Sequence, residues 1–213
     1  MKNKFLITMM MIGSNISKAQ SSAGFEQYFY ADRAGLREVI PVIYYQNKQN
    51  WYCESHFNYE RLHALSIFIG KTFSENKEFS YSFTPMIGGV AGTIKGGVAG
   101  LNSDMNYKKF FFNSQSQYVF SFEGKNADFL YSWMELGYQV IAPLLAGLSL
   151  QHTLTSPGNG KLETGFFVRY SVNKWSFPLY CFNASNENRY VILGIAREFS
   201  LSGNKTRTIL LKE

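Results

Sequence analysis

The sequence predicts an all-β fold: a closed, antiparallel, up-and-down transmembrane β-barrel of about twelve strands, or of ten if its two weakest strands do not form. Three observations lead to this prediction. Apolar and polar residues alternate along most of the chain, rings are abundant while charges are few, and the first residues are typical of an exported protein. Strands that cross a bilayer must close into a barrel, because every backbone polar group there needs a partner within the protein.

The composition separates this chain from several classes of protein. Aromatic residues make up 17% of the 213 residues. Charged residues also make up 17%, below the usual share of about 25%. No run of roughly 18 apolar residues follows the N-terminal segment, which excludes a helical membrane protein, and the many rings exclude a disordered chain. The formal net charge is +6, but the basic residues are scattered rather than gathered, so we expect no nucleic-acid partner.

The first nineteen residues have the features of a secretory signal peptide. Lys2 and Lys4 precede an apolar segment over residues 5–12, and the small residues Ser17 and Ala19 stand before a cleavage point. This apolar segment is too short to span a bilayer. We therefore expect a cleaved signal peptide at 1–19, a barrel at 20–200 and a C-terminal tail at 201–213, in the outer membrane of a Gram-negative bacterium.

Twelve segments of the mature chain show the period of two that is typical of strands. In order they are residues 25–32, 40–46, 51–59, 64–73, 79–90, 97–106, 110–122, 129–140, 144–154, 164–172, 175–183 and 190–199. The weakest are 97–106, which is rich in glycine, and 175–183, which contains Pro178. An even number of strands is typical of bacterial single-chain barrels.

The alternation is clearest in four of these segments. Over 79–87 the odd positions are apolar, over 110–122 the even positions carry rings, and over 144–154 and 164–172 the even positions are again mostly apolar. The opposite positions carry amides, hydroxyls and few charges, whereas the outer face of a soluble sandwich would be rich in Lys and Glu. We therefore assign the apolar face to lipid and the weakly charged face to a narrow interior.

The connections between the predicted strands provide a second indication. Alternate connections are short ("NKQN", "SENKE", "YKK", "NKW"), and most of the others are longer ("DRAGLRE", "EGKNAD", "TSPGNGKLE", "ASNENR"), although the turn near residues 60–62 is very tight. Rings follow the short turns at Trp51, Phe79, Phe110 and Trp175, where we expect an aromatic girdle at one membrane interface.

The alternation also predicts which side chains face the lumen. The candidates are Tyr52, Glu54, His56, Asn58, Asn113, Gln115, Gln117, Trp133, Glu135 and Arg169, and Glu198 would join them. Rings of charge in a pore set ion preference, so these residues could form a selectivity constriction or a ligand site. The alternative is that they are paired charges that brace a small interior, where an unpaired charge is costly.

Other kinds of site find little support. The three histidines show no metal-ligand spacing, and no Ser is presented to His56, so we predict no catalytic residues, no metal and no cofactor. The glycines of "IGGVAGTIKGGVAGL" lack the Gly-Lys-Ser/Thr of a phosphate loop and fit strand bends better. Cys53 and Cys181 are read as unpaired residues of the apolar face, although two Cys in an exported chain could form a disulfide.

Five segments resemble a group of small outer-membrane β-barrel proteins common in Bacteroidetes: "WYCESHFNYE", "IFIGKTF", "TPMIGGVAG", "FLYSWMELGYQV" and "VILGIAREF". The resemblance covers most of residues 40–199 and implies fold and location, and it carries no catalytic residues. The chain departs from a usual barrel ending, because "SLSGNKTRTILLKE" follows Phe199.

Together these features predict an outer-membrane channel or uptake barrel for a small polar solute. The expected partners are outer-membrane lipid, the barrel-assembly machinery and the solute. One alternative is a structural or interaction barrel whose interior is plugged by large inward side chains such as Trp133 and Phe167. An outer-membrane lipid-modifying enzyme is a third possibility, with weaker support.

Overall fold

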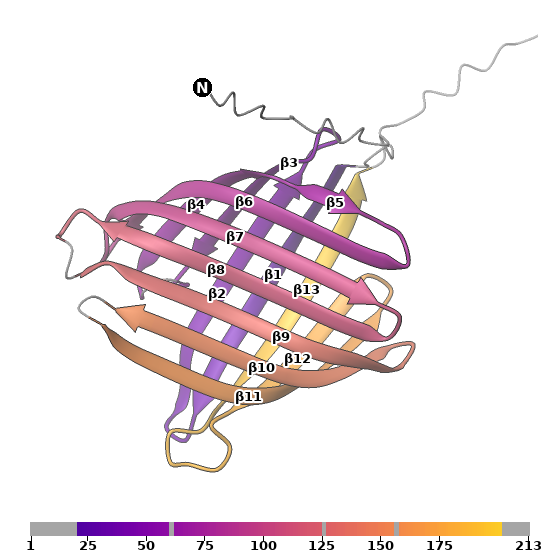
Figure 1. The fold of residues 1–213 in the computed structure, drawn as a ribbon. Coiled ribbons are helices and arrows are strands. Elements are labelled where there is room, and N and C mark those ends of the chain that lie inside the picture. Colours follow the sequence, from indigo (N-terminus) through magenta and orange to yellow (C-terminus); the bar gives the residue numbers. More distant parts are fainter. Residues whose placement is uncertain (1–20, 60–61, 125–126, 156–157, 202–213) are drawn as a thin grey trace, which may run out of the picture.

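The computed structural model describes residues 21–59, 62–124, 127–155 and 158–201, and nearly all of them lie in antiparallel strands (Figure 1). The predicted signal peptide and, apart from Leu201, the predicted tail lie outside the described residues. The strands are β1 (Ser21–Asp32), β2 (Gly35–Gln46), β3 (Trp51–Phe57), β4 (Ala64–Lys71), β5 (Phe73–Glu75), β6 (Phe79–Gly92), β7 (Gly96–Tyr107), β8 (Phe110–Ser121), β9 (Phe129–Ile141), β10 (Leu144–Thr155), β11 (Asn159–Val172), β12 (Trp175–Phe182) and β13 (Tyr190–Leu201).

The sheet closes on itself because β1 pairs with β13 as well as with β2. β4 and β5 both pair with β6 in one register, with Gly70 opposite Met86 and Phe73 opposite Phe83. They are therefore two parts of one strand, interrupted at Thr72, and the barrel has twelve strands. The predicted fold, a closed antiparallel barrel of twelve strands, is confirmed, and the fallback of ten is not needed.

Both of the strands that seemed weakest from the sequence are formed. The glycine-rich β7 pairs along its whole length with β6 and β8. In β12, Pro178 has no N–H to donate, and the pairing with β13 passes from Ser176 opposite Ala196 to Leu179 opposite Leu193. β2 and β11 begin earlier than predicted, at Gly35 and Asn159, because their pairing with β1 and β10 continues past the apolar stretch.

The outer face of the barrel is apolar, as the alternation predicts. Leu148 is 65% exposed on this face, whereas Gln151 on the inner face is 7% exposed. Large apolar side chains such as Ile43, Ile87 and Phe166 are also more than half exposed on other strands. An apolar band that surrounds a barrel is the surface that lipid requires. No helix in the described part of the chain is long and apolar enough to cross a bilayer.

The two ends of the barrel differ in their connections. At one end, which we call the short-turn end, the connections are 47–50, 76–78, 108–109, 142–143 and 173–174. The other, the loop end, includes the longer connections 122–128 and 183–189. The prediction that most connections at this end are longer holds for these two, but the stretch "DRAGLRE" is mostly strand, because only residues 33–34 join β1 to β2, and only 93–95 join β6 to β7. Hydrogen-bonded pairing there runs almost to the tip of the hairpin.

Rings and cations meet at the short-turn end. The predicted girdle residues Trp51, Phe79, Phe110 and Trp175 are the first residues of β3, β6, β8 and β12. Several basic side chains lie over rings there, including Lys71 at 5.2 Å from the Trp51 ring centre and Arg197 at 4.7 Å from that of Trp175. Such pairs suit a membrane interface, where the ring can sit at headgroup level and the charge can reach water.

Candidate functional site

A cavity of about 270 Å³ lies inside the barrel, and we call it the lumen cavity. Its wall combines ionisable groups, amides and rings, which come mainly from β1, β2, β7 to β9 and β11 to β13. The lining side chains used below are Glu26, Tyr28, Tyr59, Asp104, Phe111, Asn113, Gln115, Trp133, Glu135, Arg169, Ser176, Pro178 and Ala196. Five of the ten residues that the sequence predicts for the lumen therefore line this cavity: Asn113, Gln115, Trp133, Glu135 and Arg169.

The register of neighbouring strands explains why polar groups gather on this wall. On the inner face, Asn113 of β8 lies opposite Glu135 of β9, which lies opposite Ser149 of β10. The next inner row, two residues along each strand, contains Gln115, Trp133 and Gln151. Because side chains alternate between faces with a period of two, the registers of the two hairpins β8–β9 and β9–β10 align all of these groups.

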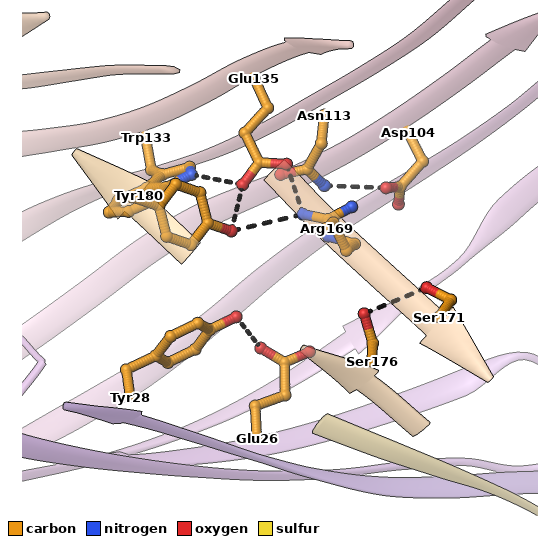
Figure 2. Close-up of polar contacts among 10 residues, drawn as sticks. All are labelled: Glu26, Tyr28, Asp104, Asn113, Trp133, Glu135, Arg169, Ser171, Ser176 and Tyr180. Atoms are coloured by element: carbon orange, nitrogen blue, oxygen red, sulfur yellow. Dashed lines mark hydrogen bonds and ion pairs between the residues drawn. The ribbon is translucent and has the colours of Figure 1, made fainter. Parts of the chain in front are cut away.

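Glu135 is the centre of a hydrogen-bond network (Figure 2). Its Oε1 accepts hydrogen bonds from Trp133 Nε1 at 3.0 Å and from the Tyr180 hydroxyl at 2.6 Å. Its Oε2 accepts from Arg169 Nη2 at 2.5 Å, which is an ion pair. Glu135 is 3% exposed, so three donors, one of them charged, offset the cost of burying its carboxylate.

The Glu135–Arg169 pair joins two strands that are not neighbours. β10 lies between β9 and β11, and Glu135 and Arg169 are opposite Ser149 and Leu145 of that strand. The inner residue between these two on β10 is Gly147. A side chain at Gly147 would meet the Leu136 carbonyl and the Gly137 backbone. The glycine therefore permits a close approach of the β9 and β10 backbones at the point where the ion pair crosses β10.

Two further carboxylates line the cavity, Glu26 across from this network and Asp104 on the same side as Glu135. Glu26 Oε2 accepts a hydrogen bond of 2.6 Å from the Tyr28 hydroxyl, and Figure 2 shows this pair on the side opposite Glu135. Asp104 Oδ1 accepts a hydrogen bond of 2.8 Å from Asn113 Nδ2. Among the described residues, neither carboxylate forms an ion pair. Three carboxyl groups therefore share the cavity wall with the guanidinium of Arg169.

A close approach of three strands fixes the position of the Tyr28 ring. A Cβ built on Gly194 would lie 2.6 Å from Pro178 Cγ and 2.9 Å from Tyr28 Cε1. Both of these distances are shorter than carbon atoms tolerate, so only glycine leaves room for the proline and the ring together. Tyr28 and Pro178 both line the cavity, and Gly194 thus shapes its wall without contributing a side chain.

A second cavity of about 400 Å³ adjoins the first at Ser176 and Ala196, which line both. Its wall also includes Lys174 and Glu198, beside the turn 173–174 of the short-turn end. We call it the mouth cavity. The two cavities together form a hollow that extends from the middle of the lumen to the short-turn end of the barrel.

Glu54 belongs to a separate cluster. It accepts a hydrogen bond from the Tyr52 hydroxyl and lies 2.6 Å from His56 Nε2. The His56 ring packs on the rings of Tyr59 and Phe68, with centre distances of 4.5 Å and 5.3 Å. Glu54 and His56 are 5% and 3% exposed. This cluster stands on β3, whereas the ion pair of Arg169 is with Glu135 on β9.

The remaining predicted lumen residues have varied surroundings. Gln115 Oε1 accepts a hydrogen bond of 2.9 Å from the Tyr59 hydroxyl, and Gln117 is fully buried, 2% exposed. Asn58 lies beyond the end of β3, with φ at 63°. Its amide donates to the Val39 carbonyl and accepts from the His63 N–H, so it shapes the turn.

The described residues hold no cluster of three or more metal-ligating side chains. Cys53 is exposed and Cys181 half-buried, and both thiols are free. Cys53 and Cys181 occupy outward positions on β3 and β12, because the inner positions there carry Tyr52 and Glu54 or Tyr180 and Phe182.

Sequence reasoning missed Glu26, Asp104 and Tyr180 as members of the site. Rings occupy both faces of β1, at Phe25, Tyr28, Phe29 and Tyr30. The sequence pattern therefore does not show which residues of this strand face the lumen. Asp104 stands in the glycine-rich strand that seemed least certain. One signal was available: Glu26, Tyr28 and Tyr30 share one parity, and a carboxylate on a membrane strand belongs on the inner face.

Comparison with solved structures identifies the fold. The chain is similar to the KdgM porin, with a TM-score of 0.60 and 11% identity over 84% of this chain and 99% of that one. For a KdgM porin in complex with disordered oligogalacturonate, the TM-score is 0.58 and the identity 11%, over 85% of this chain and 99% of that one. For the NanC porin, the TM-score is 0.50 and the identity 7%, over 84% of this chain and 100% of that one. No family model matches the sequence, and no curated protein does. At these identities the likeness shows the porin barrel fold alone.

Proposed function

We propose that this protein is an outer-membrane channel or uptake barrel that admits a small polar solute. The observation that carries the proposal is the polar hollow, formed by the lumen cavity and the mouth cavity, inside a closed barrel with an apolar outer face. Buried polar groups are costly unless they find partners, so a wall of this kind suits water or a polar solute. Membership of a small Bacteroidetes-type barrel family and export by a cleaved signal peptide are parts of the same proposal.

The solute of the KdgM complex does not fit this lumen. Oligogalacturonate, the molecule bound to that porin, is a chain of carboxylated sugars and is strongly anionic. The lumen cavity here has the carboxyl groups of Glu26, Asp104 and Glu135 against the single guanidinium of Arg169. Like charges repel at short range in a narrow, poorly solvated space. We therefore propose a solute that is neutral or cationic.

Conductance of the purified, refolded protein in a planar lipid bilayer tests the channel function. We expect discrete conductance steps, and we expect them to shrink in Ser176→Trp, which places a large ring where the two cavities meet. A matched control is Ser114→Trp on the outer face of β8, opposite Ser103 and Met134. A folded protein without conductance would contradict the proposal.

One observation favours a second function, that of a closed barrel which acts through its surface. Apolar side chains fill the lumen toward the loop end, and Phe68, Phe182 and Ile192 among them are at most 1% exposed. A barrel closed in this way would show no conductance and no uptake of solute into liposomes. The same bilayer measurement therefore separates the two functions.

The membrane location has its own test. Leu148→Arg places a charge on the outer face of β10, at a cost of about 2–4 kcal/mol if the residue lies near the bilayer midplane. Ser176→Arg places the same charge in the polar hollow. We expect the first change to block assembly and the second to permit it, as judged by heat-modifiable migration of outer-membrane fractions. Recovery of the wild-type protein in the soluble fraction, without detergent, would contradict the location.

A further inference from the structure

We propose that the lumen cavity binds a small organic cation, of the ammonium or guanidinium class. This inference rests on the proposed function and names the solute class of the same site. The charges on the cavity wall provide the first argument. Arg169 is already paired with Glu135, whereas Glu26 and Asp104 have neutral hydrogen-bond donors and, within the described residues, no cationic partner.

The positions of these two carboxylates fit a ligand between them. Glu26 stands on β1 and Asp104 on β7, which are five strands apart around the twelve-strand barrel. They therefore project from nearly opposite sides into one cavity, which they share with the guanidinium of Arg169, the partner of Glu135. A cation in the cavity would approach both carboxylates and would compensate charges that are otherwise buried with neutral partners only.

The rings on the wall provide a second argument. The guanidinium carbon of Arg169 lies 5.3 Å from the ring centre of Phe111 and 5.4 Å from that of Phe167. These distances are within the range of cation–π attraction. The wall thus already holds one cation against rings and a carboxylate. The rings of Tyr28 and Trp133, beside Glu26 and Glu135, offer the same kind of surface to a second cation.

Two buried polar atoms point to a missing partner. Ser149 Oγ and Gln151 Nε2 have no hydrogen-bond partner, although their residues are only 3% and 7% exposed. Both face the lumen from β10, in the same rows as Glu135 and Trp133. Buried polar atoms are nearly always satisfied by protein, water or ligand. Neither residue lines the lumen cavity, so a small neutral molecule such as water beside the cation would satisfy them.

The size of the cavity limits the ligand. A volume of about 270 Å³ corresponds to about nine water molecules at about 30 Å³ each. The lumen cavity therefore suits a cation of roughly that number of heavy atoms, and it excludes a polymer or a folded peptide. The negative wall also contrasts with the chain as a whole, whose formal net charge is +6.

Reversal potential in a potassium chloride gradient across a planar bilayer is the first test. We expect the wild type to favour potassium over chloride about tenfold, and Glu26→Gln/Asp104→Asn to reduce this preference to near one. Glu75→Gln is the control, because it removes an acidic residue that pairs with exposed Lys77 at the rim. An anion preference in the wild type, or an unchanged preference in the double variant, would overturn the inference.

Binding to the folded protein is the second test and does not depend on conductance. With Trp51 and Trp175 replaced by Phe, Trp133 is the sole tryptophan reporter, and tetramethylammonium should change its fluorescence. Neutral tert-butanol of similar size should not, and Glu26→Gln/Asp104→Asn should weaken the binding about tenfold or more. Binding without conductance would support the cation site and contradict the channel function. Conductance without cation preference or cation binding would support the channel function and contradict the cation site.

Discussion

The half of the lumen next to the loop end is packed with apolar side chains, whereas the half toward the short-turn end holds the polar hollow. The difference is visible along single strands. The inner residues of β8 are the amides Asn113, Gln115 and Gln117 up to the last inner position, Val119, which is fully buried at the loop end. On β12 they change from Ser176 to Phe182, again toward the loop end. One barrel wall thus encloses two kinds of interior.

Alternation therefore determines which face of the barrel a side chain occupies, but it does not determine whether the inward side chains fill the lumen. In the loop-end half, Ala64, Phe68, Ile94 and Val98 form one cluster with their neighbours, and they pack as the core of a soluble protein does. In the other half, polar groups keep a hollow open. The first half should therefore contribute most to stability, and the second should determine which solute enters.

The largest effect that we predict is at Phe68. Phe68→Ala removes a ring that is 1% exposed and leaves a cavity in the apolar half, so it should lower the free energy of unfolding by about 4 kcal/mol. Equilibrium unfolding in urea of the refolded protein measures this change. Phe120→Ala on the outer face, 52% exposed, is the control and should have a much smaller effect. Equal effects would mean that the loop-end half is not a packed core.

The next effect concerns the buried ion pair between Glu135 and Arg169 in the polar half. Arg169→Ala leaves the buried Glu135 without its cation, so it should lower the free energy of unfolding by about 3 kcal/mol. Glu135→Gln in the same chain should restore part of this loss, because the unpaired charge is the larger cost. Urea unfolding of the single and double variants measures both. A double variant no more stable than Arg169→Ala would mean that the charge of Glu135 is not the cause.

Much of the fold could be predicted from the sequence, because the period of two is a local property. Each strand, and its inward and outward faces, follows from residues such as Leu148 and Gln151, which lie three positions apart. The Glu135–Arg169 pair could not be predicted in the same way. It joins strands that are not neighbours, and it crosses β10 at Gly147, a position that is recognised only once the register is known.

The division of the lumen was also beyond the sequence. Val119 and Phe182 occupy inward positions, and an inward apolar residue suggests either a plug or a misassigned face. Ile94 stands in the connection 93–95, where a polar residue is typical, and yet it is 1% exposed. Only the three-dimensional arrangement shows that these side chains meet in one place.

A smaller effect should follow from Ile94→Ala. Ile94 extends the apolar cluster from the connection 93–95, so its truncation should lower the free energy of unfolding by about 2 kcal/mol. If the apolar half limits passage, the same change should also raise the conductance in planar bilayers. Lys95→Ala, beside it and exposed, is the control and should change neither quantity. A stability loss with unchanged conductance would place the narrowest point elsewhere in the lumen.

The smallest effect is expected at Asn113, and it compares the two halves within one strand. Asn113→Ala removes the 2.8 Å hydrogen bond to Asp104, but water can enter the hollow and replace the lost donor, so the loss should be about 1 kcal/mol. Val119→Ala on the same inner face of β8 removes two methyl groups from the dry half and should cost about 2 kcal/mol. Urea unfolding of the two variants measures the free energy of unfolding that each one loses. If Asn113→Ala proves as costly as Val119→Ala, water does not reach Asp104, and the polar half is as tightly closed as the apolar one.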